Sequence, residues 1–599
     1  MKPTRWTSLL IILLALALFA LAAWRLDSLK QLRSEHDLDP ADVHTEAQVA
    51  ARLRIPTIGL SVFRSLAIDY LWIRADNLKQ QGQYFDALHL ARLICELQPQ
   101  LPSVWKFQAW NMTYNISVAM PTAPERWNWV LAGIELLRDK GLRACPGQAD
   151  LYRELAWYFH HKIGGVTDEY HWYYKEQLAR VMMQLLGPAG GTNDELRRLD
   201  AAPLTWDDLL ADPNVATVLD RVADLEHSLN STDTFVENWL RFAQQPEDFS
   251  IEFRQYLMDH AQDPDLITLD RFARAWALRN HWRLDPKFML DLNHRYGPVD
   301  FENPQAPRTS LDWRLPFAHG LYWACQGLPD AQPASFDYLQ LQRMVYGNLQ
   351  DLFHKGQLQL LVFEQPPPDL EPRQPGQEIL QKQRFTELRM FLSQDLRMFP
   401  AAWQATQEVL QAYRDAGQEV PQSVEDAGEY IAWAGIENLY LLGRSEAAGY
   451  YFRILRQQYP DNPDYRLPLD QFVRTRILEE VEQMTPKRAA AYIDSLLRNA
   501  HRYWAQLNDE MAMAFYARAE QVHALYLKQH DLPTARIKMP PLSEMAILAY
   551  QHLLTDPVES PIIKQVLLAR LQQENPQVLE RIQSNLQQAP TNGPTTPKP

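Results

Sequence analysis

Small residues recur in the first part of the chain at the spacing of paired helices. Ala109 follows Ala75 by 34 residues, and a second segment opening at Pro102 follows a similar one at Ile68 by the same distance. Helices that pack about 8–10 Å apart leave no room for a branched side chain where they cross. The spacing therefore predicts stacked helix pairs. An array of such pairs needs no single core, which suits a chain of 599 residues.

These segments resemble tetratricopeptide repeats, which are helix–turn–helix units of 34 residues. Ala91 departs from the family, which has a large aromatic residue there, and the second unit has a long inter-helix loop at 119–125. The resemblance implies an α-solenoid of helical hairpins. The matching residues at the family's packing positions are Ala75, Gly82, Ala87, Pro99, Ala109, Ala156, Gly443, Ala448, Phe452 and Pro460.

An uncharged run of 19 residues, Trp6 to Trp24, lies near the start of the chain. As a helix it would be roughly 28 Å long, close to the ~30 Å hydrocarbon core of a bilayer. We expect a retained transmembrane signal-anchor. The alternative is a cleaved signal peptide, because Ala20–Ala22 imitates a cleavage site. The expected location is the bacterial inner (plasma) membrane, with a single pass and the bulk of the chain extracytoplasmic.

The remaining chain predicts an all-α fold with little β-structure, because glycine is only 22 of 599 residues and good helix formers dominate. Leu358–Phe363 is the best strand candidate. We expect these segments in chain order: a transmembrane signal-anchor (1–24), a juxtamembrane segment (25–66), helical repeats like the family's (67–187), a middle helical region (188–364), a proline-rich linker (365–377), a second helical-repeat region (378–555), and a C-terminal helix with a disordered tail (556–599).

As a whole, the chain also resembles uncharacterised single-span bacterial membrane proteins with helical repeats. The suggestive stretches are FQAWNMTYNISV, HHKIGGVTDEYHWYYK and LDWRLPFAHGLYWA. That resemblance implies no activity.

No phosphate-binding loop, dinucleotide fingerprint, zinc-protease motif or hydrolase elbow is present in the sequence. We therefore expect no cofactor and no metal. A net charge of −15 argues against nucleic acid as a partner. One polar stretch holds His160, Asp168 and His171, whose side chains are of types that bind metals. The alternative is that Gly164-Gly165 form a turn between helices, with Asp168 as a helix cap.

A second polar stretch contains Asp312, Arg314 and His319. Asp312 and Arg314 form either a functional polar anchor or an ion pair that fixes a loop before the helix expected at Pro316.

The family's ligand-facing positions carry aromatic residues in this chain, and its usual basic positions carry Asp69, Asp76 and Asp150, with Lys106 and Arg153 as the exceptions. They imply a mildly acidic, aromatic groove for an apolar or basic peptide. The alternative is that the tryptophans are wedges in the core. The residues concerned are Trp72, Lys106, Trp110, Tyr114, Arg153, Trp157 and His161.

The function expected from these features is a membrane-anchored helical-repeat scaffold that binds other proteins and has no assignable catalytic activity. The first alternative is an enzyme, or a subunit of an enzyme complex, of the cell envelope. It would use the polar groups of 160–171 or 312–319. The second is a structural tether.

Overall fold

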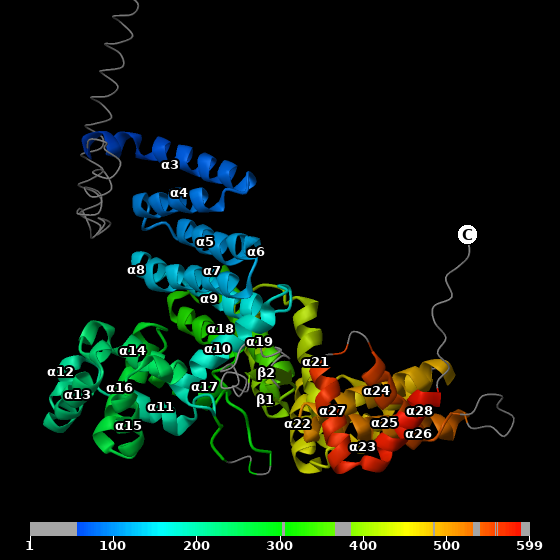
Figure 1. Ribbon diagram of the computed structural model, residues 1–599. Helices are drawn as coiled ribbons and strands as arrows, with labels where there is room; N and C mark the ends of the chain where they lie inside the picture. The colour runs from blue at the N-terminus through cyan, green and yellow to red at the C-terminus, as the bar shows by residue number, and fades with distance from the viewer. Residues whose placement is uncertain are drawn as a thin grey trace, which may run out of the picture. The chain divides into compact units, whose positions relative to one another are not determined.

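The computed structural model describes residues 57–301, 303, 306–365, 385–482, 486–530, 539–556, 559 and 561–588. These residues are mostly helical (Figure 1). The chain forms two compact units. Unit 1 runs through Ala119 and takes in Asn128–Pro146, and unit 2 comprises Met120–Trp127 and the chain from Gly147 onward.

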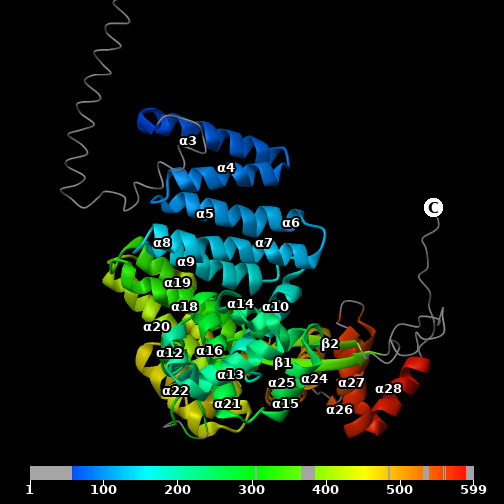
Figure 2. The same cartoon turned by 60° about the vertical axis from the view of Figure 1, so that its left-hand side comes forward.

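Unit 1 is built from antiparallel helices, of which α3, α4 and α5 lie side by side in both views (Figure 1 and Figure 2). A further helix, α7, is shared between the units. The elements are α3 (Thr57–Gln80), α4 (Tyr84–Leu97), α5 (Pro102–Trp110), η1 (Asn111–Ile116), α6 (Ser117–Ala119), α7 (Ala123–Glu135), η2 (Leu136–Gly141) and α8 (Leu142–Ala144).

Glycine ends the first helix of two hairpins in the same way. Gly82 and Gly443 have positive φ values of 74° and 76°. The amide after Gly82 donates to the Leu78 carbonyl at 2.9 Å, and the amide after Gly443 donates to the Leu439 carbonyl at 2.9 Å. Both are Schellman-type caps, which favour glycine because it adopts positive φ without strain. They reverse the chain between α3 and α4 and between α21 (Gln422–Leu441) and α22 (Ser445–Gln458).

The predicted crossing alanines are all buried, as close helix packing requires. Phe452 is buried, Pro99 is half-buried and Pro460 is exposed. The Pro99 carbonyl accepts a hydrogen bond from Trp105 Nε1 at 2.6 Å. The buried alanines are Ala75, Ala87, Ala109, Ala156 and Ala448.

Three successive helices each contain a six-residue segment of π-helix, and we call these segments π-turns. They are η1, η2 and η3 (Tyr158–Ile163). Each π-turn carries at least one buried polar or charged residue, among them Thr113, Arg138 and Lys162. At η1 the approach of α7 is close, because a Cβ atom on Gly133 would lie 2.2 Å from Thr113 Oγ1. In proteins generally, such π-helical segments distort the helix that contains them and often occur at functional sites.

Unit 2 contains the remaining elements. Its helices are α9 (Ala149–Trp157), η3 (Tyr158–Ile163), α10 (His171–Leu186), α11 (Asn193–Asp200), α12 (Trp206–Leu210), α13 (Pro213–Leu225), η4 (His227–Leu229), α14 (Thr232–Gln244), η5 (Pro246–Asp248), α15 (Ile251–Asp259), α16 (Pro264–Asn280), α17 (Pro286–Tyr296), α18 (Pro316–Gly327), η6 (Leu328–Asp330), α19 (Phe336–Lys355), η8 (Leu396–Met398), α20 (Phe399–Asp415), α21 (Gln422–Leu441), α22 (Ser445–Gln458), η9 (Pro463–Arg466), α23 (Leu469–Glu482), α24 (Pro486–Ala505), α25 (Asp509–His530), α26 (Leu542–Thr555), α27 (Pro561–Glu574) and α28 (Pro576–Gln588).

Several helices of unit 2 start at an Asp-Pro pair. The side chains of Asp212, Asp263 and Asp285 each accept a hydrogen bond from the backbone amide of the second helical residue, and proline occupies the first helical position. Proline is suited to that position because its missing N–H would have no partner inside the helix.

The core of unit 2 is centred on α18, which packs against α9, η3 and α19. Almost every residue of α18 is buried. Trp313, Phe317 and Tyr322 are among the largest fully buried side chains. Gly320 permits the close approach of α19, because a Cβ atom there would lie 2.2 Å from Asn348 Oδ1.

Two strands pair antiparallel: β1 (Gln357–Gln365) and β2 (Phe385–Ser393), in a register that joins Gln357 to Ser393. β1 contains the predicted strand Leu358–Phe363, whereas β2 was not expected. The predicted proline-rich linker, 365–377, lies outside the described residues except for its first residue. The tail predicted from Gln588 also lies outside them, except for Gln588 itself, which ends α28.

The prediction of a single-span membrane protein requires correction. Among the residues that the structure describes, no helix is both long enough and apolar enough to cross a bilayer. The expected span, 6–24, lies outside those residues. The fold class is therefore corrected to a helical protein with one two-stranded sheet in its described part. The assignments that rested on the span, a signal-anchor and an inner-membrane location, are withdrawn with it.

Candidate functional site

A row of aromatic side chains connects α3 and α5 in unit 1. The Trp72 and Phe107 rings meet edge to face with centroids 4.6 Å apart. Trp110 stacks on Tyr114 at 5.6 Å. The ammonium of Lys79 lies 5.7 Å from the Phe107 centroid and 5.5 Å from that of Trp110. We call these five residues the aromatic row.

The members of the aromatic row differ in exposure. Trp110 is 39% exposed, and the other four are half-buried. Lys106, one helical turn before Trp110, is half-buried as well. The sequence analysis missed Phe107 and Lys79. Lys79 was within reach, because it stands at position 12 of the first unit, one of the family's ligand-facing positions.

The other predicted groove residues belong to unit 2. Trp157 is 38% exposed, and its ring stacks on His161 at 4.6 Å with an interplanar angle of 9°. Arg153 is half-buried one turn earlier. A single groove that joins these residues to the aromatic row stays a prediction.

Asp168 is the centre of a buried polar cluster in unit 2. It accepts hydrogen bonds from Lys162 Nζ at 2.7 Å, from the Tyr174 hydroxyl at 3.2 Å and from the Tyr170 amide at 3.0 Å. Arg126 Nη1 lies 3.5 Å from the carboxylate. Burial acts to raise the pKa of Asp168, but the hydrogen bonds from Lys162 and Tyr170 and the positive charges outweigh it, so the pKa is lowered.

Lys175 is a second buried cation, on the following helix. Its Nζ atom donates to the Gly165 carbonyl at 2.7 Å and lies 3.1 Å from His171 Nδ1. Burial, with a contribution from Lys355, lowers the pKa of Lys175 to about 7. Burial and the neighbouring Lys175 lower the pKa of His171 to about 4. These contacts hold the Gly164-Gly165 turn between η3 and α10.

The metal-binding alternative for 160–171 finds no support in this geometry. His160 turns toward α19, with Nδ1 3.3 Å from Asn348 Oδ1 and Nε2 3.7 Å from Asp351 Oδ2. Lys175 Nζ lies 3.1 Å from His171 Nδ1 and so occupies the place of a metal ion on that nitrogen. Within the described part of the chain, no group of three His, Cys, Asp or Glu residues is placed to hold a metal ion.

Asp312 and Arg314 form an ion pair, whereas His319 is separate from them. Arg314 donates to Asp312 through Nε at 2.8 Å and Nη2 at 2.6 Å. His319 is fully buried, with Nε2 2.9 Å from the Trp313 carbonyl oxygen and its ring stacked on Phe159. Asp312 and Arg314 line a cavity of about 350 Å³.

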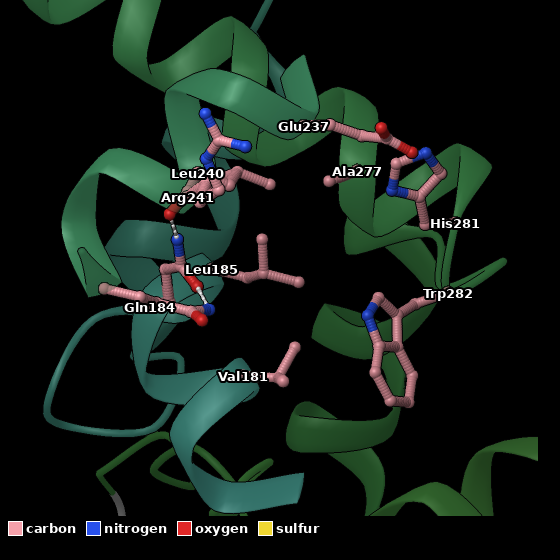
Figure 3. Close-up of a pocket in the computed structure, with 10 residues that line it drawn as sticks. Val181, Gln184, Leu185, Glu237, Leu240, Arg241, Ala277, His281 and Trp282 are labelled. Atoms are coloured by element: carbon pink, nitrogen blue, oxygen red, sulfur yellow. Dashed lines mark hydrogen bonds between the residues drawn. The ribbon is translucent and has the colours of Figure 1, made fainter. Parts of the chain in front are cut away.

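A further pocket of about 310 Å³ lies between α10, α14 and α16 (Figure 3). Val181, Leu185 and Ala277 contribute apolar side chains. Glu237 points toward His281 at one end (Figure 3). Gln184 donates to the Leu240 carbonyl and accepts from Gln244 Nε2 at 2.7 Å. The lining is thus mixed, and the sequence analysis singled out none of it.

Comparison with known proteins adds no assignment: no family model, no curated protein and no solved structure matches the chain. The resemblance to tetratricopeptide repeats stays a prediction.

Proposed function

We propose that the protein binds a peptide segment of another protein on the aromatic row of unit 1. The observation that carries the proposal is Trp110, which keeps 39% of its surface exposed although Tyr114 and Lys79 hold it in place. Tryptophan is among the residues most enriched at the energetic centres of protein interfaces. A ring that is already ordered loses little conformational freedom on binding.

The charge beside the row indicates the chemistry of the peptide. The Lys79 ammonium stands where a cationic side chain of a partner would meet the rings. Lys106 adds a second positive charge one turn before Trp110. The position of Lys79 therefore favours an apolar side chain flanked by carboxylates, in place of the basic peptide that the sequence predicted.

The proposal is tested with a random peptide library displayed on phage and selected on the purified full-length protein. Selected peptides are then measured by fluorescence polarisation against wild type and Trp110→Ala. We expect peptides with an aromatic or aliphatic residue next to Asp or Glu. Trp110→Ala should weaken their binding by about 30- to 700-fold, the equivalent of removing an interface anchor.

Trp105→Ala is the matched control, because Trp105 lies on the same helix but is 7% exposed. It should lower the stability of the protein, whereas Trp110→Ala should leave stability close to that of the wild type. Lys79→Met tests the charge and should weaken acidic peptides selectively. The proposal fails if the selected peptides bind Trp110→Ala as tightly as wild type, or if basic peptides are enriched.

A further inference from the structure

Two loops of unit 2 have matching sequences and the same local geometry. Residues 310–317 read SLDWRLPF and residues 393–400 read SQDLRMFP. In each loop the aspartate accepts from the backbone amide of the arginine two residues later, at 3.1 Å. The arginine Nε atom donates to the same carboxylate at 2.8 Å in both loops. Each loop leads directly into a helix, α18 or α20.

The two Asp-x-Arg loops line the same cavity of about 350 Å³. That volume is at the lower end of the range of small-molecule pockets, ~300–1,000 Å³. Thr309, Ser310 and Gln357 add hydroxyl and amide groups to its wall. Residues 83 positions apart are thus brought together around one polar space.

The walls of the cavity are held in place from outside. The Trp313 amide donates to the Gly190 carbonyl at 3.0 Å, and the Val299 amide donates to the Arg397 carbonyl at 3.1 Å. Gly190 has a φ of 74°, and a Cβ atom on it would lie 2.4 Å from Asp312 Oδ1. The two ion pairs therefore form a rigid lining.

The two arginines differ in how far their hydrogen bonds are used within the protein. Arg314 uses Nε and Nη2 on Asp312 and Nη1 on the Pro188 carbonyl, at 2.6 Å. Arg397 uses Nε and Nη2 on Asp395, both at 2.8 Å. All three nitrogens of the Arg314 guanidinium are therefore engaged, whereas Asp395 leaves the Nη1–Nη2 edge of Arg397 unused.

The charges of the cavity also cancel, because each carboxylate is paired with one guanidinium. A net charge on the ligand would gain little. Carboxylate oxygens next to N–H groups suit a ligand group that both donates and accepts, and a hydroxyl is such a group.

We propose that this cavity binds a neutral polyhydroxylated molecule of the size of a mono- or disaccharide. Its hydroxyls would donate to Asp312 and Asp395 and accept from the Arg397 side chain and the Ser310 hydroxyl. The proposal is independent of peptide binding in unit 1, and neither needs the other.

Saturation-transfer difference NMR with neutral sugars tests the proposal on the full-length protein. The probes are glucose, galactose, N-acetylglucosamine, maltose, cellobiose and trehalose, each alone at millimolar concentration. Inorganic phosphate is the anionic probe, followed by its ³¹P line width. We expect saturation of the ring protons of at least one sugar and no broadening of the phosphate line.

Ala189→Trp places a large side chain in the cavity from an exposed position of its wall. It leaves both ion pairs intact, so the fold should be retained. Ala201→Trp is the matched control, since Ala201 is exposed and does not line the cavity. The sugar signal should fall at least tenfold in Ala189→Trp and persist in Ala201→Trp. The proposal is overturned if no sugar shows saturation, if Ala189→Trp keeps the signal, or if phosphate binds instead.

Discussion

Replacing Asp168 by asparagine should open the turn between η3 and α10. The substitution keeps the size of the side chain but removes the charge that pairs with Lys162, whose side chain is 2% exposed. Removing one member of a buried ion pair leaves an uncompensated charge and costs about 3–5 kcal/mol. Because Tyr174 and the Tyr170 amide also donate to this carboxylate, the loss should be felt across the whole turn.

Hydrogen exchange followed by mass spectrometry measures this loss locally, which matters because a chain of two units does not unfold in one step. Peptides that cover residues 158–186 should exchange about 100- to 4,000-fold faster in Asp168→Asn. This factor is the change in the local opening equilibrium that corresponds to a loss of about 3–5 kcal/mol. Asp194→Asn is the control, because Asp194 pairs with Arg197 at the surface with its side chain 77% exposed. Exposed ion pairs contribute about 0–1 kcal/mol. The exchange rate in Asp194→Asn should therefore differ from that of wild type by less than about fivefold.

A double variant separates charge from packing. Asp168→Leu combined with Lys162→Met removes both charges together and should exchange much more slowly than Asp168→Asn alone, because apolar replacement of a buried pair is often tolerated. If Asp168→Asn exchanges no faster than Asp194→Asn, the buried cluster does not hold the turn and the reasoning is refuted.

Three other outcomes are expected. Because burial lowers the pKa of Lys175 to about 7, below its unfolded value of about 10.4, the unfolded chain binds more protons between these values. The free energy of unfolding of wild type should therefore rise relative to that of Lys175→Met as the pH rises through that window, by up to about 1.4 kcal/mol per pH unit. Urea unfolding at several pH values measures this difference, and a difference in midpoints that does not change with pH would contradict the prediction. Gly190→Ala should cost more in thermal unfolding than Gly187→Ala. Both glycines have positive φ, but only at Gly190 would the new Cβ atom meet other atoms; equal losses would count against the close approach. Ala448→Leu should lower the unfolding midpoint, an overpacking cost of about 1–3 kcal/mol, since Ala448 is fully buried; an unchanged midpoint would count against a helix crossing there.

Local signals predicted that the described part of the chain is mostly helical. Gly82 and Gly443 adopt positive φ values at hairpin turns. Because glycine favours that conformation, a glycine between two helical segments predicts such a turn. The positive φ of 59° at Leu507, between α24 and α25, is in contrast carried by a residue that does not favour this conformation. Strand β2 was missed, although Leu388 and Met390 alternate with charged residues in a pattern that favours a strand.

The candidate sites depended on information that local patterns do not carry. The pairing of Lys162 with Asp168 requires the chain to reverse at Gly164-Gly165 and bury both charges. The repeated Asp-x-Arg sequence was visible, but only the tertiary fold brings Asp312 and Asp395 to one cavity. Tyr114 lies inside η1, where the helix departs from 3.6 residues per turn. Repeat positions counted on an α-helical period therefore lose their meaning beyond that point.

The path of the backbone between the two units has a consequence for how the protein is made. The chain passes from unit 1 to unit 2 after Ala119, returns after Trp127 and leaves again after Pro146. A ribosome that adds about 5–20 residues per second delivers the chain in order. Unit 1 therefore has to wait for residues 128–146 to emerge, after the first piece of unit 2 has been synthesised. No single peptide-bond cleavage separates the units, and a truncation placed after Ala119 or Trp127 leaves unit 1 without residues 128–146.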